Sequence, residues 1–148
     1  MSLLLHKSHN VSILLYHLVC PTKYRRVVID EKVDLVVVEA CKEIALRYEM
    51  HFLEIGTDRD HVHFLIQSIP TYAPTKIARV VKSLTARAVF ARAPEVKKKL
   101  WGGEFWSDGY FISTVGRRGS ESGVRDYVRG QAGQRAYTRL HQDQLRML

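Results

Sequence analysis

Cysteine is nearly absent from this sequence of 148 residues, which contains only Cys20 and Cys41. Two cysteines cannot build a disulfide framework, and no Cys-x-x-Cys pair is present to suggest a zinc site. A reducing compartment is therefore the simpler setting for the chain.

Long apolar runs are absent as well. Three leucines at positions 3–5 begin an apolar stretch, but His6 and Lys7 interrupt it at once, so it does not predict a signal peptide. No run approaches the roughly 20 apolar residues that a membrane-spanning helix needs. We therefore expect a cytoplasmic protein that has no membrane partner.

Acidic residues are in the minority. Lys and Arg outnumber Asp and Glu by 23 to 15, and the formal net charge is +8. Because clustered cations attract phosphates and release counterions on contact, this excess favours a polyanionic partner. The remaining composition, 46% hydrophobic and 26% charged, is that of a globular protein, and the length suits a single domain over residues 1–148.

Apolar periodicity predicts elements in the order strand, helix, strand, strand, helix, strand, helix. The first six match an α+β fold of the ferredoxin-like, split β-α-β type, with an antiparallel four-stranded sheet and both helices on one face. We expect strands at 11–19 and 110–115, a hairpin over 51–69, and helices at 30–48, from 71 or 73 to before Pro94, and at about 120–131. The core then spans about 11–115, with a glycine-flanked hinge at 116–119 and a tail at 132–148.

Two histidines stand one residue apart in Asp60-His61-Val62-His63, at the start of the second hairpin strand. Successive strand side chains point to opposite faces, so His61 and His63 share one face of the sheet. Two imidazoles placed in this way after an acidic turn can chelate one metal ion. The same spacing also arises by chance in half-buried residues that bond only to the backbone, so the pair alone is a weak signal.

A basic loop with one aromatic residue follows the first strand and consists of Lys23, Tyr24, Arg25 and Arg26. It serves equally well as a solvated connector or as a phosphate-binding loop in which Tyr24 stacks on a base.

Two further segments can contribute to a nucleic-acid surface. The outer face of the second long helix is basic, and Arg79 and Lys82 are our candidates there, although such faces are usually only solvated. Trp101 and Trp106 lie in a Gly-rich loop, where they can fill the core or stack on bases; core packing is expected for at least one of them.

Tyr127 and Gln131 lie four residues apart on the last expected helix, so their side chains share one face. A surface tyrosine beside a polar neighbour is the ordinary interpretation. The alternative joins them to the histidines, because two imidazoles and one amide oxygen make three metal ligands with open positions, and the Tyr127 hydroxyl can then attack a phosphate that the metal polarises. A hard amide oxygen and vacant positions suit Mg²⁺ or Mn²⁺ better than a closed Zn²⁺ site.

Together these segments resemble the single-tyrosine transposases of the HUH endonuclease superfamily, the IS200/IS605 type. The resemblance is carried by Tyr24-Arg25-Arg26 after an early strand, Asp60-His61-Val62-His63 before an apolar strand, Trp101-Gly102-Gly103, Phe105-Trp106-Ser107-Asp108-Gly109-Tyr110-Phe111, Ser113-Thr114-Val115-Gly116, and Tyr127 with Gln131. These motifs follow one another over nearly the whole chain.

The resemblance implies a role for each matching residue. His61, His63 and Gln131 would bind the metal ion, and Tyr127, on the C-terminal helix, would attack a scissile phosphate in single-stranded DNA. The products would be a 5′-phosphotyrosine link and a free 3′-OH, which later rejoins the DNA. The resemblance also implies single-stranded DNA with hairpins at the element ends as the partner, a homodimer with shared active sites, and a prokaryotic protein that is associated with the nucleoid when on DNA.

Other functions remain open beside this leading one. A second is a module that binds hairpin DNA or RNA without cutting it. A third, a phosphoesterase for a small substrate, normally needs a second histidine motif, which is not supplied by His17, His51 or His141. Domesticated repeat-processing relatives share the motifs, so the sequence does not separate them from an active transposase. Gly130 also weakens the last helix beside Gln131.

Overall fold

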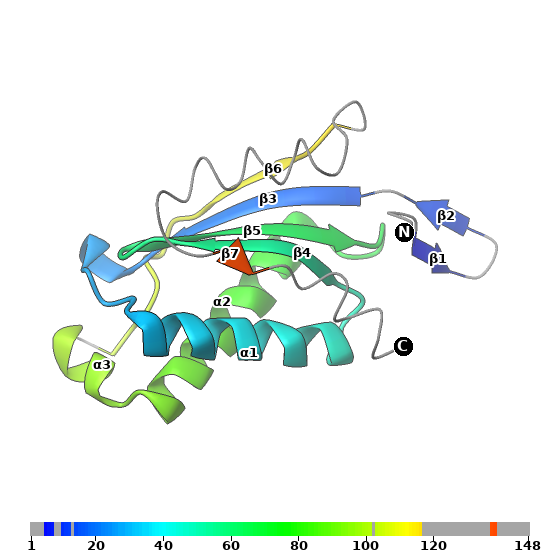
Figure 1. The fold of residues 1–148 in the computed structure, drawn as a ribbon. Helices are drawn as coiled ribbons and strands as arrows, with labels where there is room; N and C mark the ends of the chain where they lie inside the picture. Colours follow the sequence, from blue (N-terminus) through cyan, green and yellow to red (C-terminus); the bar gives the residue numbers. More distant parts are fainter. Residues whose placement is uncertain (1–4, 8–9, 13, 102, 117–136, 139–148) are drawn as a thin grey trace.

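The fold is built on an antiparallel sheet with two long helices packed on one of its faces (Figure 1). The structure, a computed structural model, describes residues 5–7, 10–12, 14–101, 103–116 and 137–138. Within these residues the large sheet contains β3 (Leu14–Pro21), β4 (His51–Thr57), β5 (His61–Ser68), β6 (Phe111–Thr114) and β7 (Tyr137–Thr138). Their order in the sheet is β6-β3-β5-β4-β7, and every adjacent pair is antiparallel.

The four longer strands and the two long helices follow the ferredoxin-like pattern that the sequence predicts. In chain order they run β3, α1 (Glu31–Arg47), β4, β5, α2 (Pro74–Arg92) and β6. The first and third of these strands are neighbours at the centre of the sheet, and the second and fourth flank them, which is the split β-α-β arrangement. The predicted α+β fold is confirmed.

Helix α1 begins at a polar cap. The Asp30 side chain accepts a hydrogen bond from the Val33 N–H at 2.8 Å, which satisfies one of the N–H groups that the start of a helix leaves open. Its buried stripe includes Val33, Val37, Cys41 and Ile44, as the 3.6-residue period predicts.

Helix α2 begins with a proline instead of a capping side chain. Ala73 precedes the helix and makes no side-chain cap, while Pro74 occupies the first turn, where its missing N–H would have no helical partner in any case. Ile77 and Val81 are fully buried, and Arg79 on the other side of the helix is exposed. The helix therefore has one face in the core and a basic face toward solvent.

The core lies between the sheet and the two helices. Phe52 of β4 and Phe64 of β5 are fully buried there, with their rings edge to face at 6.1 Å. Full burial of such a side chain contributes about 1.5–3 kcal/mol. Cys20 and Cys41 belong to the same core, and burial raises the pKa of the Cys20 thiol to about 12, which makes it a packing residue rather than a reactive one.

The structure differs from the sequence prediction in its short elements. Residues 11–19 do not form one strand: β2 (Asn10–Ser12) pairs with β1 (Leu5–Lys7) in a separate hairpin, and β3 begins only at Leu14. The short helices η1 (Lys23–Arg25) and α3 (Glu95–Lys99) are additional. Strand β7 lies within the expected tail and pairs with β4. Elements of two to five residues are too short to leave a period in the sequence.

Residues 117–119 of the expected hinge and the C-terminal helix expected at about 120–131 lie outside the described residues. Among the helices that are described, none is long and apolar enough to cross a membrane.

Candidate functional site

The His61 and His63 side chains lie side by side on the sheet face that points away from α1 and α2. Their ring centroids are 5.0 Å apart, with the ring planes at 74°. The alternating residues Val62 and Phe64 are fully buried in the core between sheet and helices, so strand alternation places the histidines on the other face. His63 is only 4% exposed, and the His61 side chain 16%.

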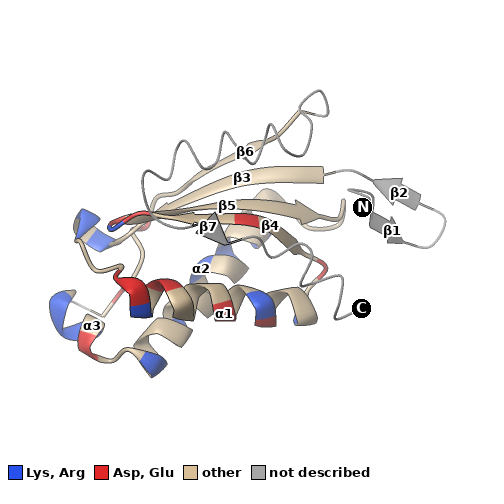
Figure 2. Cartoon of the chain, viewed as in Figure 1, with Lys and Arg blue, Asp and Glu red and all other residues tan. Residues whose placement is uncertain are grey.

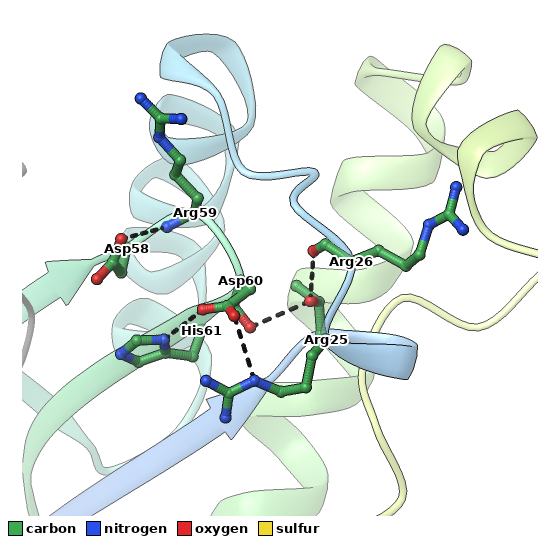
Figure 3. Close-up of polar contacts among 7 residues, drawn as sticks. Arg25, Arg26, Asp58, Arg59, Asp60 and His61 are labelled. Carbon is green, nitrogen blue, oxygen red and sulfur yellow. Dashed lines mark hydrogen bonds and ion pairs between the residues drawn. The ribbon is translucent and has the colours of Figure 1, made fainter.

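An acidic side chain holds the His61 ring. Asp60 Oδ1 lies 2.7 Å from His61 Nδ1, and Arg25 Nε donates to Asp60 Oδ2 at 3.2 Å (Figure 3). Burial raises the pKa of the Asp60 carboxyl, but the His61 hydrogen bond and the Arg25 charge outweigh that effect, so the pKa lies below its ordinary value. Because an ionised carboxylate only accepts hydrogen bonds, His61 carries its proton on Nδ1 and would bind a metal through Nε2.

A third histidine, His17 of β3, holds the His63 ring. His17 Nε2 lies 2.8 Å from His63 Nδ1, and the ring planes differ by 20°. Strand pairing brings the two together, because Val19 stands opposite His63 and His17 stands opposite Leu65, which makes His17 a diagonal neighbour on the same face. His17 is 3% exposed, and burial lowers its pKa. No pattern in the sequence predicts a role for this residue.

These surroundings fit a metal-binding pair. Histidines that bind metals commonly donate their second ring N–H to a carboxylate or another acceptor, which fixes the tautomer; Asp60 and His17 stand in those positions. In the part of the chain that the structure describes, no three His, Cys, Asp or Glu side chains are grouped to hold a metal. A metal ion held by the pair would therefore take any third His, Cys, Asp or Glu ligand from beyond the described residues. The predicted third ligand Gln131 and the predicted nucleophile Tyr127 lie outside the described residues.

The basic loop after β3 is anchored to the turn that precedes His61. Thr22 N–H donates to the Asp60 carbonyl oxygen at 2.8 Å, and the Thr22 hydroxyl bonds to the Arg26 carbonyl oxygen at 2.7 Å. Between these anchors Tyr24 and Arg25 have positive φ angles of 57° and 53°. A non-glycine residue in this region carries about 1–3 kcal/mol of strain, and such residues cluster at ligand-binding sites. The Tyr24 side chain is 64% exposed.

Two of the six residues predicted to bind DNA, Lys23 and Lys82, contact the 104–110 loop. Lys23 Nζ lies 2.8 Å from the Glu104 carboxylate and 3.8 Å from that of Asp108, and the hydrogen bond to Glu104 raises the pKa of Lys23. Lys82 Nζ donates to the Asp108 carbonyl oxygen at 3.1 Å and lies 5.2 Å from the centre of the Tyr110 ring. Lys23 attaches the 104–110 loop to η1, and Lys82 attaches it to α2, so both lysines have a structural role.

The other candidates are presented to solvent. Tyr24, Arg25, Arg26 and Arg79 are exposed, although Arg25 also pairs with Asp60 as described above. The Arg26 guanidinium lies 5.2 Å from the centre of the Trp101 ring, which is itself 73% exposed. Figure 2 shows that Lys and Arg gather at the end of the molecule where η1 and α3 lie. Basic and aromatic groups together are what single-stranded nucleic acid requires.

The second tryptophan of the Gly-rich loop is a core residue. Trp106 is 5% exposed, its Nε1–H donates to Thr85 Oγ1 at 2.9 Å, and its ring meets Phe105 edge to face at 4.5 Å. The loop also joins the end of β3, because Ser107 N–H donates to the Pro21 carbonyl oxygen at 2.9 Å. The expectation that at least one tryptophan packs in the core is confirmed.

A groove of about 360 Å³ lies between α2 and this loop. Lys82, Arg87 and Phe90 line its helix side, and Glu104 and Asp108 belong to the opposite side. The groove offers two cations and a phenyl ring, the groups that bind the backbone and bases of a single strand. The carboxylates opposite offset part of that positive charge.

Known proteins resemble this chain over most of its length. The model of the family described as transposase, IS200 like, matches residues 10–131. The ISDra2 transposase TnpA of Deinococcus radiodurans is 30% identical over 116 residues, which cover 78% of this chain and 82% of that protein. The transposase for insertion sequence element IS200 of Salmonella typhimurium is 25% identical over 116 residues, 78% of this chain and 75% of the relative.

Two solved structures share the fold. A candidate transposase from Deinococcus radiodurans R1 matches with a TM-score of 0.68 at 24% identity, over 88% of this chain and 100% of the other. A REP-associated tyrosine transposase bound to a REP hairpin matches with a TM-score of 0.55 at 12% identity, over 86% of this chain and 68% of the other. At these identities the likeness establishes the fold alone.

Replacing Thr85 by valine tests the anchor of Trp106. Valine keeps the shape of threonine but removes the hydroxyl that accepts the Trp106 N–H. Because an unsatisfied buried donor costs about 1–3 kcal/mol, Thr85→Val should lower the free energy of unfolding by about that amount in a urea titration followed by fluorescence. Thr85→Ser keeps a hydroxyl and should lose clearly less. If Thr85→Val is as stable as the wild type, the hydrogen bond is not an anchor.

Proposed function

Because the chain belongs to the family of IS200-like transposases, we propose that it is a metal-dependent single-stranded DNA transposase that nicks and rejoins DNA at hairpin-flanked element ends through a 5′-phosphotyrosine intermediate. Membership of the family makes the chain a transposase and a DNA-processing enzyme; the single-stranded substrate, the metal and the covalent link are our proposal. The observation that carries it is the His61–His63 pair, whose Nδ1 atoms are each engaged by a neighbouring side chain.

The residues that would hold the divalent ion, Mg²⁺ or Mn²⁺, are His61, His63 and Gln131. Such an ion, when bound, would polarise the scissile phosphate and stabilise the charge that develops on its oxygens. Asp60 would keep the His61 ring in its binding tautomer and orientation. A third ligand from beyond the described residues agrees with the finding that, within the described part, no three His, Cys, Asp or Glu side chains are arranged to hold a metal ion.

Tyr127 would be the nucleophile. Its hydroxyl oxygen would form a bond to phosphorus, the bond between phosphorus and the 3′ oxygen of the preceding nucleotide would break, and the proton lost by the phenol would be matched by one gained by that oxygen. A 5′-phosphotyrosine and a free 3′-OH result. The ester conserves the energy of the broken bond, so the 3′-OH of a strand can later attack it and rejoin the DNA without ATP. The ordinary pKa of a phenol, about 10, means that deprotonation needs help at neutral pH.

Exposed aromatic and basic residues would bind the single strand. Tyr24 and Trp101 offer faces on which bases can stack, and Arg26 already lies over the Trp101 ring. Arg25 would contact a phosphate with the part of its guanidinium that does not face Asp60. Lys23 and Lys82 would contribute mainly to the local potential, because each is held by the 104–110 loop.

We extend the proposal to a homodimer with active sites shared between subunits. Strand β6 is the outer strand on its side of the sheet among the described residues, and Phe111 on this strand is 55% exposed. Apolar side chains on an outer strand favour pairing with a second copy of the chain. A tyrosine segment that follows this strand would then be close to both subunits.

A nucleoprotein gel tests the nucleophile. Labelled single strands from the DNA flanking the gene, in both polarities, are incubated with the protein and Mg²⁺ or Mn²⁺ and separated under denaturing conditions. We expect a covalent protein–DNA band with the wild type and none with Tyr127→Phe, which lacks only the attacking oxygen. Tyr110→Phe, at a tyrosine that is exposed, is the matched control and should keep the band. A chelator or duplex DNA should abolish it.

The result separates the alternatives. Tight binding of a flank without any covalent band would favour a module that binds hairpins without cutting. A covalent band that survives Tyr127→Phe would reject this residue as the nucleophile. If the only strands cleaved are dispersed repeats elsewhere in the genome, the protein is a domesticated repeat-processing relative.

Replacing Trp101 by alanine tests the stacking surface. Because stacking of a base on an aromatic side chain contributes about 1–3 kcal/mol, Trp101→Ala should weaken binding of a labelled single strand by about 5- to 150-fold in fluorescence anisotropy at fixed salt. Leu46→Ala removes an equally apolar, 61% exposed side chain on α1 and should leave binding unchanged. Equal affinity of Trp101→Ala and the wild type would remove this residue from the DNA surface.

A mixing experiment tests the shared sites. A protein carrying His61→Ala and His63→Ala is inactive alone, and so is Tyr127→Phe. If each active site takes its histidines from one subunit and its tyrosine from the other, mixed dimers regain one complete site, and the covalent band should return on mixing. A mixture that stays inactive under conditions of subunit exchange means that each subunit uses its own tyrosine.

A further inference from the structure

We propose that His17 is a positioning residue, which keeps His63 in the tautomer that can bind a metal ion through Nε2. The inference rests on the proposed function, because it assumes that His63 is a metal ligand. It adds to that function a buried residue from another strand, 46 positions away in the sequence.

The distance between the two rings requires a single shared hydrogen. His17 Nε2 and His63 Nδ1 are 2.8 Å apart, so one of the two nitrogens donates and the other accepts. If His63 donates from Nδ1, its Nε2 has no hydrogen and presents a lone pair to a metal. If His17 donates instead, a neutral His63 carries its hydrogen on Nε2 and cannot bind there. Metal binding at His63 therefore needs His17 to act as the acceptor.

The structure holds the His17 ring in place for this task. His17 lies on β3, between β5 on one side and β6 on the other, and it is 3% exposed. Its ring meets the Phe111 ring of β6 in a T-shaped arrangement, with the ring centroids 6.1 Å apart and the planes at 74°. On the other side the nearly parallel His63 ring has its centroid 5.1 Å away. A ring enclosed in this way offers a fixed acceptor.

His61 and His63 thus have different kinds of hydrogen-bond partner. Asp60 is an ionised acceptor, so it leaves His61 no choice of tautomer. His17 is itself an imidazole and can be either donor or acceptor, so the arrangement at His63 depends on both rings together. A neutral imidazole in water prefers its hydrogen on Nε2, and the acceptor at His17 reverses that preference. Loss of the hydrogen-bond partner of a metal-binding histidine typically lowers metal affinity about 10- to 100-fold. We expect a loss of this size when the His17 acceptor is removed.

Two substitutions of similar size separate hydrogen bonding from packing. His17→Gln retains an amide oxygen that can accept from His63 Nδ1, whereas His17→Met fills a comparable volume without a good acceptor. We expect His17→Met to weaken Mn²⁺ binding to the full-length protein by about 10- to 100-fold, and His17→Gln to remain within a few-fold of the wild type. His51→Met removes another half-buried histidine from the sheet and should leave Mn²⁺ affinity unchanged. The concentration of free Mn²⁺ is measured by electron paramagnetic resonance in the absence of DNA.

A second measurement does not depend on any variant folding. In ¹⁵N-labelled wild type with saturating Mg²⁺, the long-range ¹H–¹⁵N spectrum of the histidines should show His63 protonated at Nδ1. A hydrogen on His63 Nε2 under these conditions overturns the proposal, and so does a folded His17→Met protein that binds Mn²⁺ as tightly as the wild type.

The controls distinguish failure of this inference from failure of the proposed function. If the wild type binds Mn²⁺ and the protein carrying both His61→Ala and His63→Ala does not, the metal site is supported. The His17 variants then test the role of His17 alone. If the wild type binds no Mn²⁺ that depends on those two histidines, the metal site itself is wrong and the inference falls with it.

Discussion

The antiparallel pairing of β3 with β5 places the three histidines of the site, His17, His61 and His63. Its register sets Val19 opposite His63 and Pro21 opposite His61, and the hydrogen bond from Thr22 to the Asp60 carbonyl continues the pairing into the loop. A slip by one residue would turn the histidines into the core, because strand side chains alternate. Apolar residues on the opposite face of β5 oppose such a slip, since they would then leave the core between the sheet and the helices. Packing of apolar side chains on one face of the sheet thus determines that the histidines lie on the other face.

The same pairing connects the histidines to the basic loop. Arg25 and His61 bond to the two oxygens of one carboxylate, that of Asp60, so a phosphate that attracts Arg25 acts on a group that orients His61 (Figure 3). The positive φ angles of Tyr24 and Arg25 indicate that the loop is held in a strained shape by its anchors rather than by its own preference. The loop that would touch DNA is therefore bonded directly to the turn that precedes the histidine pair, so a movement of one would move the other.

Local sequence patterns predicted the parts of this arrangement that depend on neighbours in the chain. Alternation placed His61 and His63 on one face, and the 3.6-residue period gave α1 and α2 with their buried stripes. The contact of His17 with His63 was not predicted, because it depends on the register of two strands 46 residues apart, which alternation within either strand does not determine. The ion pair of Lys23 with Glu104 was also missed, because it joins two segments far apart in the chain; a charge predicted to be available for DNA is engaged within the protein.

The face on which the histidines lie also limits the direction from which the proposed ligand Gln131 and the proposed nucleophile Tyr127 could reach them. Since α1 and α2 cover the opposite face, the amide and phenol of Gln131 and Tyr127 would have to approach the sheet from the side without these helices. The connection begins at Gly116, which is exposed and has space around it: a Cβ there would meet no atom within 4 Å, and its φ is not in the left-handed region. Glycine at this position is therefore not required by crowding or by backbone geometry. In the shared-site proposal, the wide backbone freedom of glycine at this position would suit a segment that has to reach either of two sites.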